Sequence, residues 1–168
     1  GKAVISFSED GGKSYTPPAP VIDTPLDDRD AGILAFGKSS VLVTSFNNTI
    51  KFQRDFNNQK NYQAESGFRG WADKELVESY LATVTPEEEE RYLGAEFRIS
   101  ENGGVTFGKL HKSPITSPHG PICLKDGTVL WVGRTFNPAD TFRAESDEIQ
   151  AHRIHPDGSM SYVGRIPP

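Results

Sequence analysis

The chain has 168 residues and carries a formal net charge of −5, so it has no basic excess of the kind that nucleic-acid-binding domains show. Its length is that of one domain, and no apolar run approaches the roughly 18 residues of a membrane-spanning helix. We therefore expect a single domain over residues 1–168, without a membrane span and without nucleic acid as a partner. The single Cys123 lies between Ile122 and Leu124, which predicts a buried structural thiol.

The first predicted element is a short strand near residues 3–7, followed by the turn Ser-Glu-Asp-Gly-Gly-Lys-Ser-Tyr at 8–15. The turn recurs 92 positions later as Ser-Glu-Asn-Gly-Gly-Val-Thr-Phe at 100–107, again after a strand-like run. An Asp or Asn here can accept backbone N–H bonds, and the glycines permit positive φ. We expect Asp10 and Asn102 to close their own turns and the aromatics to be largely buried. The structural positions of the two turns are Ser8, Asp10, Gly12, Tyr15, Ser100, Asn102, Gly104 and Phe107.

Two hairpins of β-rich runs follow the same plan. The first has strands at 33–36 and 41–46, and the second has strands at 121–124 and 128–133. Each hairpin is followed, along the chain, by two more predicted strands, at 95–100 and 108–112 for the first and at 148–154 and 159–166 for the second. The chain should thus contain two four-stranded antiparallel units in series, preceded by the last strands of another unit.

Residues 47–94 form an insertion between the second and third strands of the first unit. They begin with polar, aromatic-rich sequence, and residues 72–81 then show apolar positions at helical spacing. Thr85 and Pro86 followed by acidic residues predict a second helix start, and Gly94 predicts its end. We expect the only substantial helices within 72–93.

The two turns resemble the Asp box, or bacterial neuraminidase repeat, of the sialidase superfamily, and the two hairpins also resemble those of a sialidase-like blade. This resemblance implies an all-β chain that forms part of a six-bladed β-propeller, with about two and a half four-stranded antiparallel blades and a small helical insertion. Because so few blades cannot close a ring, the partners would be the remaining blades or further copies of the chain, and we favour a fragment of a longer protein. The resemblance also implies a secreted, periplasmic or cell-surface location.

Sialidases bind a sugar carboxylate through arginines, use an Asp as acid/base and use a Tyr–Glu pair as nucleophile. By resemblance, Asp30 is the catalytic candidate, without a cofactor or metal. The substrate-binding candidates lie on connections that should meet at the end of the sheets opposite the Asp boxes: Arg29, His119, Arg134, Arg69 and Trp71. No residue matches the Tyr–Glu pair. The run 164–167 looks like the family's arginine motif but should end an outer strand.

Three functions remain open at this point. The chain could belong to an exo-acting glycoside hydrolase of extracellular or host glycans, to a non-catalytic glycan-binding propeller, or to a structural or protein-binding propeller. The residues also have simpler interpretations. Arg29 could belong to a salt-bridge network in its loop, His119 could merely pack its turn, and Trp71 could anchor the insertion. A functional role and a purely structural role predict different surroundings for each of these side chains.

Overall fold

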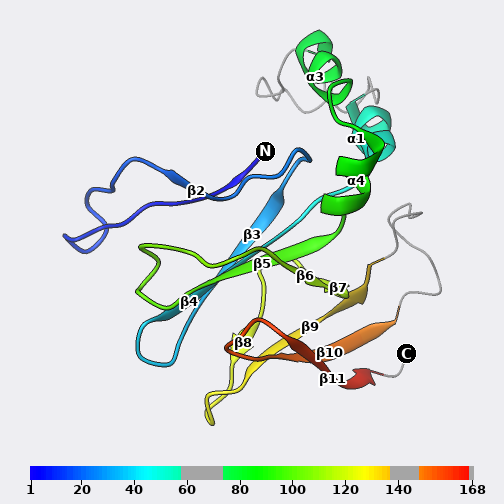
Figure 1. Cartoon of the computed structure of the whole chain (residues 1–168). Coiled ribbons are helices and arrows are strands. Elements are labelled where there is room, and N and C mark those ends of the chain that lie inside the picture. Colours follow the sequence, from blue (N-terminus) through cyan, green and yellow to red (C-terminus); the bar gives the residue numbers. More distant parts are fainter. Residues whose placement is uncertain (58–73, 137–147, 167–168) are drawn as a thin grey trace, which may run out of the picture.

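The computed structural model describes residues 1–57, 74–136 and 148–166, and their strands form three antiparallel sheets (Figure 1). β1 (Ala3–Ile5) pairs with β2 (Ala19–Ile22). The second sheet has the order β3 (Arg29–Phe36), β4 (Ser40–Phe46), β5 (Ala95–Ser100) and β6 (His111–Ser113). The third has the order β11 (Met160–Ile166), β10 (Ile149–Ile154), β9 (Val129–Thr135), β7 (Ile115–Thr116), and β8 (Ile122–Cys123) also pairs with β9. The prediction of antiparallel units joined in series is confirmed.

The strand predicted at 121–124 is β8, and a second short strand that was not predicted, β7, lies before it beside β9. The innermost strand of the third sheet consists of β7 and β8, which pair with opposite ends of β9. His119 and Gly120 between them both have positive φ, 70° and 78°. An extended strand cannot run through such residues, so the chain leaves the ladder there and returns at Ile122.

The sheets stack face to face through an apolar core. Alternate residues of β4 and β5 contact alternate residues of β9 and β10, with Phe97 and Trp131 in edge-to-face contact at 6.2 Å between ring centroids. A second apolar cluster joins β1 and β2 to the other face of β4, with Ile22 and Val43 at its centre. Each sheet therefore buries the period-2 apolar pattern that its sequence shows.

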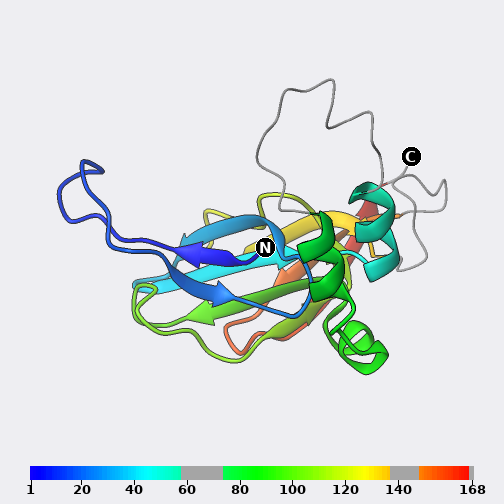
Figure 2. The same cartoon turned by 90° about the horizontal axis from the view of Figure 1, so that it is seen from above.

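Three helices lie together at one end of the sheets, as the view from above shows (Figure 2). α3 (Lys74–Leu81) and α4 (Pro86–Tyr92) occupy the predicted region, and α4 begins with the expected cap, in which Thr85 and Glu88 bond each other's backbone N–H groups. α1 (Ile50–Asn57) lies outside 72–93, so the expectation that helices are confined to that range is wrong. The backbone N–H of Ile50 donates to the Glu89 carboxylate, 2.8 Å away, so a group from a distant helix caps α1. No helix among the described residues is both long and apolar enough to cross a membrane.

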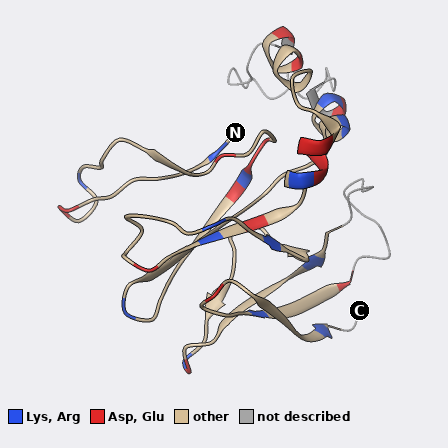
Figure 3. Cartoon of the chain, in the orientation of Figure 1, with Lys and Arg blue, Asp and Glu red and all other residues tan. Residues whose placement is uncertain are grey.

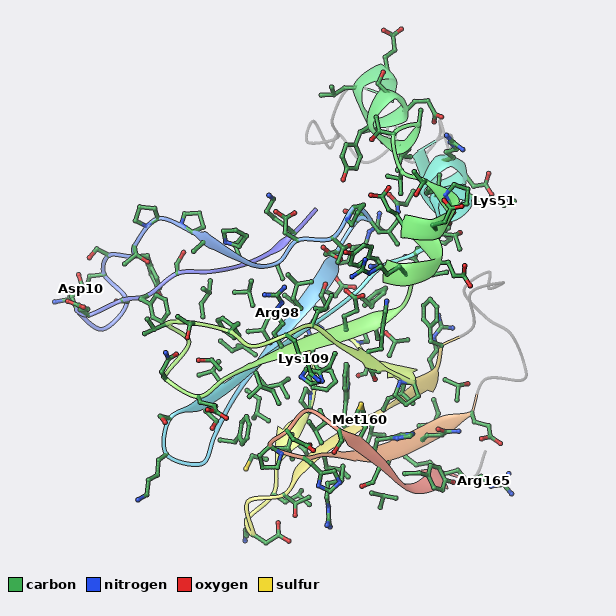
Figure 4. All side chains as sticks on the ribbon, in the orientation of Figure 1. Asp10, Lys51, Arg98, Lys109, Met160 and Arg165 are labelled. Atoms are coloured by element: carbon green, nitrogen blue, oxygen red, sulfur yellow. The ribbon has the colours of Figure 1, made fainter. Side chains whose placement is uncertain are left out.

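The turns at 8–15 and 100–107, called the Asp-box turns below after the motif they resemble, lie at the other end of the sheets (Figure 1). Figure 4 shows Asp10 at the tip of the β1–β2 loop and Lys51 on α1 at the opposite side of the molecule. The β3–β4 turn also lies at the Asp-box end, because Gly103 donates to the Ser39 carbonyl and the Ser39 hydroxyl donates to the Glu101 carbonyl, both at 2.7 Å.

The predicted closure of both turns is confirmed. Asp10 accepts from the backbone N–H groups of Lys13 and Ser14, at 2.9 and 3.0 Å, and Asn102 accepts from that of Thr106 at 2.9 Å. The expectation about the aromatics is wrong for Tyr15, which is 66% exposed, because nothing in the described chain covers the projecting loop. Phe107 is half-buried against the apolar cluster around Val43.

The prediction of a buried thiol is also wrong, because Cys123 is exposed. β8 lies at the margin of its sheet and both of its residues are exposed.

Candidate functional site

A cavity of about 570 Å³ lies at the helical end and is lined by residues of both the β3–β4 sheet and the β7–β9 sheet. Its walls come from the start of β3, the end of β4, α1, β7, the loop after it and the end of β9. Aromatic, hydroxyl and charged side chains line it together: Arg29, Asp30, Phe46, Asn48, Thr49, Phe52, Thr116, Ser117, Pro118, Val132, Gly133, Arg134, Phe136 and Ile149. A mostly apolar concavity with a few polar groups is the usual form of a small-ligand site.

Arg29 and Asp30 enter the cavity from a β-bulge at the start of β3. Arg29 pairs with Phe46 and Gly32 pairs with Thr44, so two residues of β3 face Ser45 alone. Asp30 takes a φ of 47°, and the Ser45 hydroxyl donates to the Arg29 carbonyl at 2.8 Å. Bulges re-aim side chains and concentrate beside active sites. The bulge places Asp30 at the cavity edge instead of within the regular sheet.

The two residues other than glycine that have positive φ in the described chain are Asp30 and His119. They lie on either side of one contact between the sheets. A Cβ on Gly32 would lie 2.4 Å from the His119 carbonyl carbon, so the backbones touch there and glycine is required. Such backbone conformations cost about 1–3 kcal/mol each and cluster at ligand sites.

The structure separates the predicted site residues into three groups. Arg29, Asp30 and Arg134 line the same cavity. His119 is exposed and is not among the described residues that line it, although the neighbouring Ser117 and Pro118 do line it. Arg69 and Trp71 lie outside the described residues.

Sequence reasoning missed the apolar part of the site. Phe46, Phe52 and Phe136 line the cavity from the ends of β4, α1 and β9. Phe136 directly follows β9, and its ring lies 3.5 Å from the position a Cβ on Gly94 would take. A positional signal was available for two of them, because Phe46 ends β4 and Phe136 directly follows β9, whereas Phe52 lies within α1.

The charges at the cavity are partly paired. The Arg29 guanidinium forms an ion pair with Asp27, whose side chain is 27% exposed. Burial opposes ionisation of Asp27, but the hydrogen bond from the Gly1 ammonium and the charge of Arg29 outweigh it and lower the pKa of this carboxyl. Arg29 therefore belongs to a loop ion pair and to the cavity wall at once. Elsewhere, Lys and Arg are spread among acidic residues over sheets and helices (Figure 3).

Other acidic groups near this end have structural roles. Asp28 is buried, accepts from the Thr24 N–H and hydroxyl at 2.7 and 2.8 Å, and also accepts from Asn47 at 3.3 Å. Within the described ranges, no three His, Cys, Asp or Glu side chains gather as metal ligands would. Asp30 is the one carboxylate among the described residues lining the cavity.

Comparison with known proteins adds a likeness of fold. No protein-family model and no curated protein matches the chain. Among solved structures, the chain is similar to a protein of unknown function from Dyadobacter fermentans DSM 18053, with a TM-score of 0.54 at 16% sequence identity. The match covers 98% of this chain and 44% of that one, so this chain spans less than half of that protein's length.

Proposed function

We propose that the cavity binds an anionic carbohydrate and that the chain is part of a sialidase-like β-propeller. The observation that carries this proposal is that Arg29 and Arg134, 105 positions apart in the sequence, line one cavity with three phenylalanines. Guanidinium groups suit carboxylates because their donors match both oxygens. Aromatic rings suit the apolar face of a sugar.

Two features support a built site over an accidental hollow. The Ser45 hydroxyl donates to the Arg29 carbonyl, next to the strained Asp30, and the close contact at Gly32 fixes the adjoining wall. Gly133 in the wall is equally constrained, because a Cβ there would lie 2.4 Å from the Thr116 carbonyl oxygen. The cavity shape is thus set by backbone contacts, which lowers the cost of ordering the site on binding.

Hydrolysis is the second candidate, and Asp30 favours it. A carboxyl at the edge of a sugar site can transfer a proton to a leaving oxygen. Most glycosidases also need a second carboxylate or an equivalent nucleophile, and the described cavity wall supplies one carboxylate. Binding is therefore the function that the described geometry supports best, with hydrolysis as its extension in a longer protein.

Calorimetric titration with N-acetylneuraminate, glucuronate and uncharged methyl glucoside tests the proposal. We expect the two acids to bind and the neutral sugar to bind at least about 10-fold more weakly, which corresponds to roughly 1.4 kcal/mol. Arg29→Ala and Arg134→Ala should each weaken binding of the acids by a similar factor. Arg165→Ala is the matched control, because Arg165 is 69% exposed and does not line the cavity. Equal binding of charged and neutral sugars would contradict the role of the arginines.

A further inference from the structure

Two of the four histidines of the chain lie in the joint between the second and third sheets, by which we mean the apolar core around Phe97 and Trp131. His111 on β6 pairs with Phe97, and the two rings stack with their centroids 5.1 Å apart. The His111 ring also lies against the β10–β11 turn of the third sheet, since a Cβ on Gly158 would lie 2.0 Å from His111 Cε1. The imidazole of His111 is therefore part of the contact between the two sheets.

His152 lies on the facing surface of the third sheet. It is the cross-strand partner of Trp131 and of Tyr162, so it shares the face that is buried against the second sheet, and it is 7% exposed. One ring nitrogen lies 2.9 Å from Gln150 Oε1, and the ring packs edge-on against Tyr162, with 5.6 Å between centroids. Each of the two sheets thus contributes one histidine to the joint.

The surroundings of His111 favour its neutral form. Burial and the charge of Lys109 lower the pKa of His111, and the opposing charge of Asp157 is weaker. The exposed Glu101 and Asp157 line the same hollow, of about 690 Å³, as the half-buried His111. Protons from solvent therefore reach this histidine while the sheets are stacked.

Burial alone lowers the pKa of His152. Among the charged side chains that the structure describes, Glu148 is linked to the ring through Gln150, whose amide donates to the Glu148 carboxylate at 3.0 Å. Glu148 is also paired with Arg165 at 3.5 Å. In the described chain, a proton on His152 would thus place a buried positive charge away from any carboxylate, at a cost that separation of the sheets removes.

We propose that this joint is a proton-operated switch, in which protonation of His111 and His152 separates the second and third sheets and changes the shape of the cavity that both sheets line. A group whose pKa is lowered in the folded state contributes stability above its ordinary value, 6.5 here, and loses it as the pH falls through the lowered value. The cavity depends on the joint, because Gly32 touches the His119 backbone across the two sheets. The joint would respond to protons whatever the cavity binds.

Thiol labelling at two buried alanines tests the proposal. In a Cys123→Ser background, Ala95→Cys places a probe in the joint, and Ala3→Cys places a matched control in the apolar cluster between the first and second sheets. Ala95 is 1% exposed and Ala3 is 3% exposed. The labelling rates are divided at each pH by that of the exposed Lys13→Cys, which removes the effect of pH on the thiol itself.

Between pH 7.5 and pH 5, we expect the relative rate at Ala95→Cys to rise at least about 10-fold, as for a site that reacts through a local opening coupled to protonation. The relative rate at Ala3→Cys should not rise, since its cluster contains no histidine among the described residues. His111→Gln combined with His152→Gln should remove most of the rise at Ala95→Cys. His119→Asn is the control and should leave the rise in place, because His119 is exposed and Asn also accepts its positive φ.

Three results would overturn the proposal. A constant relative rate at Ala95→Cys would show that the joint does not respond to protons, and an unchanged rise in the double glutamine variant would assign the response to other groups. A parallel rise at both alanine positions would show that the whole chain unfolds in acid. The single variants His111→Gln and His152→Gln, which should each remove part of the rise, serve if the double variant is unstable. Acrylamide quenching of Trp131 in a Trp71→Phe chain, divided by the fluorescence lifetime, gives the same comparison should a cysteine variant fail to fold.

Discussion

The loops at the two ends of the stacked sheets are held in place in different ways. At the Asp-box end, each turn closes with hydrogen bonds among its own residues, and the first turn does so although Tyr15 beside it is exposed. At the cavity end, the bulge in β3 is held within its own sheet by Ser45, but the close approach of Gly32 to His119 joins two sheets. The turns of the first end therefore close with their own residues, whereas the shape of the cavity end also depends on the contact between the stacked sheets.

The largest expected effect comes from breaking the contact at Gly32. Gly32→Ala should lower the free energy of unfolding by about 3 kcal/mol or more, because a Cβ would lie 2.4 Å from backbone atoms that cannot move independently. Gly164→Ala is the control and should stay within about 0.5 kcal/mol, since no atom lies within 4 Å of its Cβ position. Urea unfolding measures both. Equal stabilities would show that the sheets do not need this close approach.

The ion pair between Glu96 and Lys112 should rank second. Lys112 Nζ lies 2.6 Å from Glu96 Oε1, and Glu96 is 1% exposed whereas the Lys112 side chain is 46% exposed. Lys112→Met should cost about 2 kcal/mol at neutral pH, less than a fully buried pair would, because water screens the exposed cation. The double variant with Glu96→Gln should recover most of that loss in thermal or urea unfolding. No recovery would mean that the lysine acts by packing alone.

The pH dependence of the stability gives a second test of the buried Glu96. Burial raises the pKa of Glu96, against the opposing hydrogen bond and charge of Lys112. A carboxyl whose pKa is raised in the folded state favours folding when it is protonated. This contribution is lost as the pH rises from 4.5, the ordinary pKa of a glutamate, through the raised pKa of the folded state. Glu96→Gln should therefore gain stability relative to the wild type as the pH rises from 4.5 towards 8. A constant difference across that range would contradict the shift.

At the Asp-box end, we expect a smaller and local effect. Asn102→Ala should lower the free energy of unfolding by about 1 kcal/mol, because it removes the acceptor of the Thr106 N–H. Asn102→Asp should retain most of the stability, since Asp10 performs the same role in the first turn. A loss of several kcal/mol in either variant would show that the turn is coupled to the stacked sheets.

The smallest expected effect is the pH response of the first turn. Hydrogen bonds from the Ser14 hydroxyl and backbone N–H hold the pKa of Asp10 far below its ordinary value. Such a group contributes stability above the unfolded-state pKa and loses it only as the pH falls through the lower folded-state value. Exchange of the Lys13 and Ser14 amides, corrected for intrinsic rates, should stay slow down to about pH 3. Asp10→Ala should abolish that protection, and early loss of protection in the wild type would contradict the bonding.

The difference between the ends also explains what could be predicted from the sequence. The Asp-box bonds and the cap of α4 depend on residues within a few positions of one another, so the pattern around Asp10, Asn102 and Thr85 was sufficient. The strands that have clear β-rich runs were likewise predicted from the sequence. These features are local, and local chemistry is what a single sequence displays.

The features that were missed depend on distant partners. α1 is capped by Glu89, β7 pairs with the end of β9 near Thr135, and the exposure of Tyr15 depends on what lies beside its loop. Arg29 and Arg134 could be placed at one end by topology alone. The wall that surrounds them, with Phe46, Phe52 and Phe136, required the three-dimensional structure.

Under the proposed function, the cavity end binds an anionic sugar and the Asp-box end does not. Chemical-shift mapping of the labelled chain during titration with N-acetylneuraminate tests it most directly. We predict that the amides of residues 29–30, 116–117 and 133–134 shift together and saturate, while those of 8–15 and 100–107 stay in place. Shifts confined to the Asp-box turns, or no shifts at all at millimolar sugar, where even a weak sugar site should respond, would contradict the account.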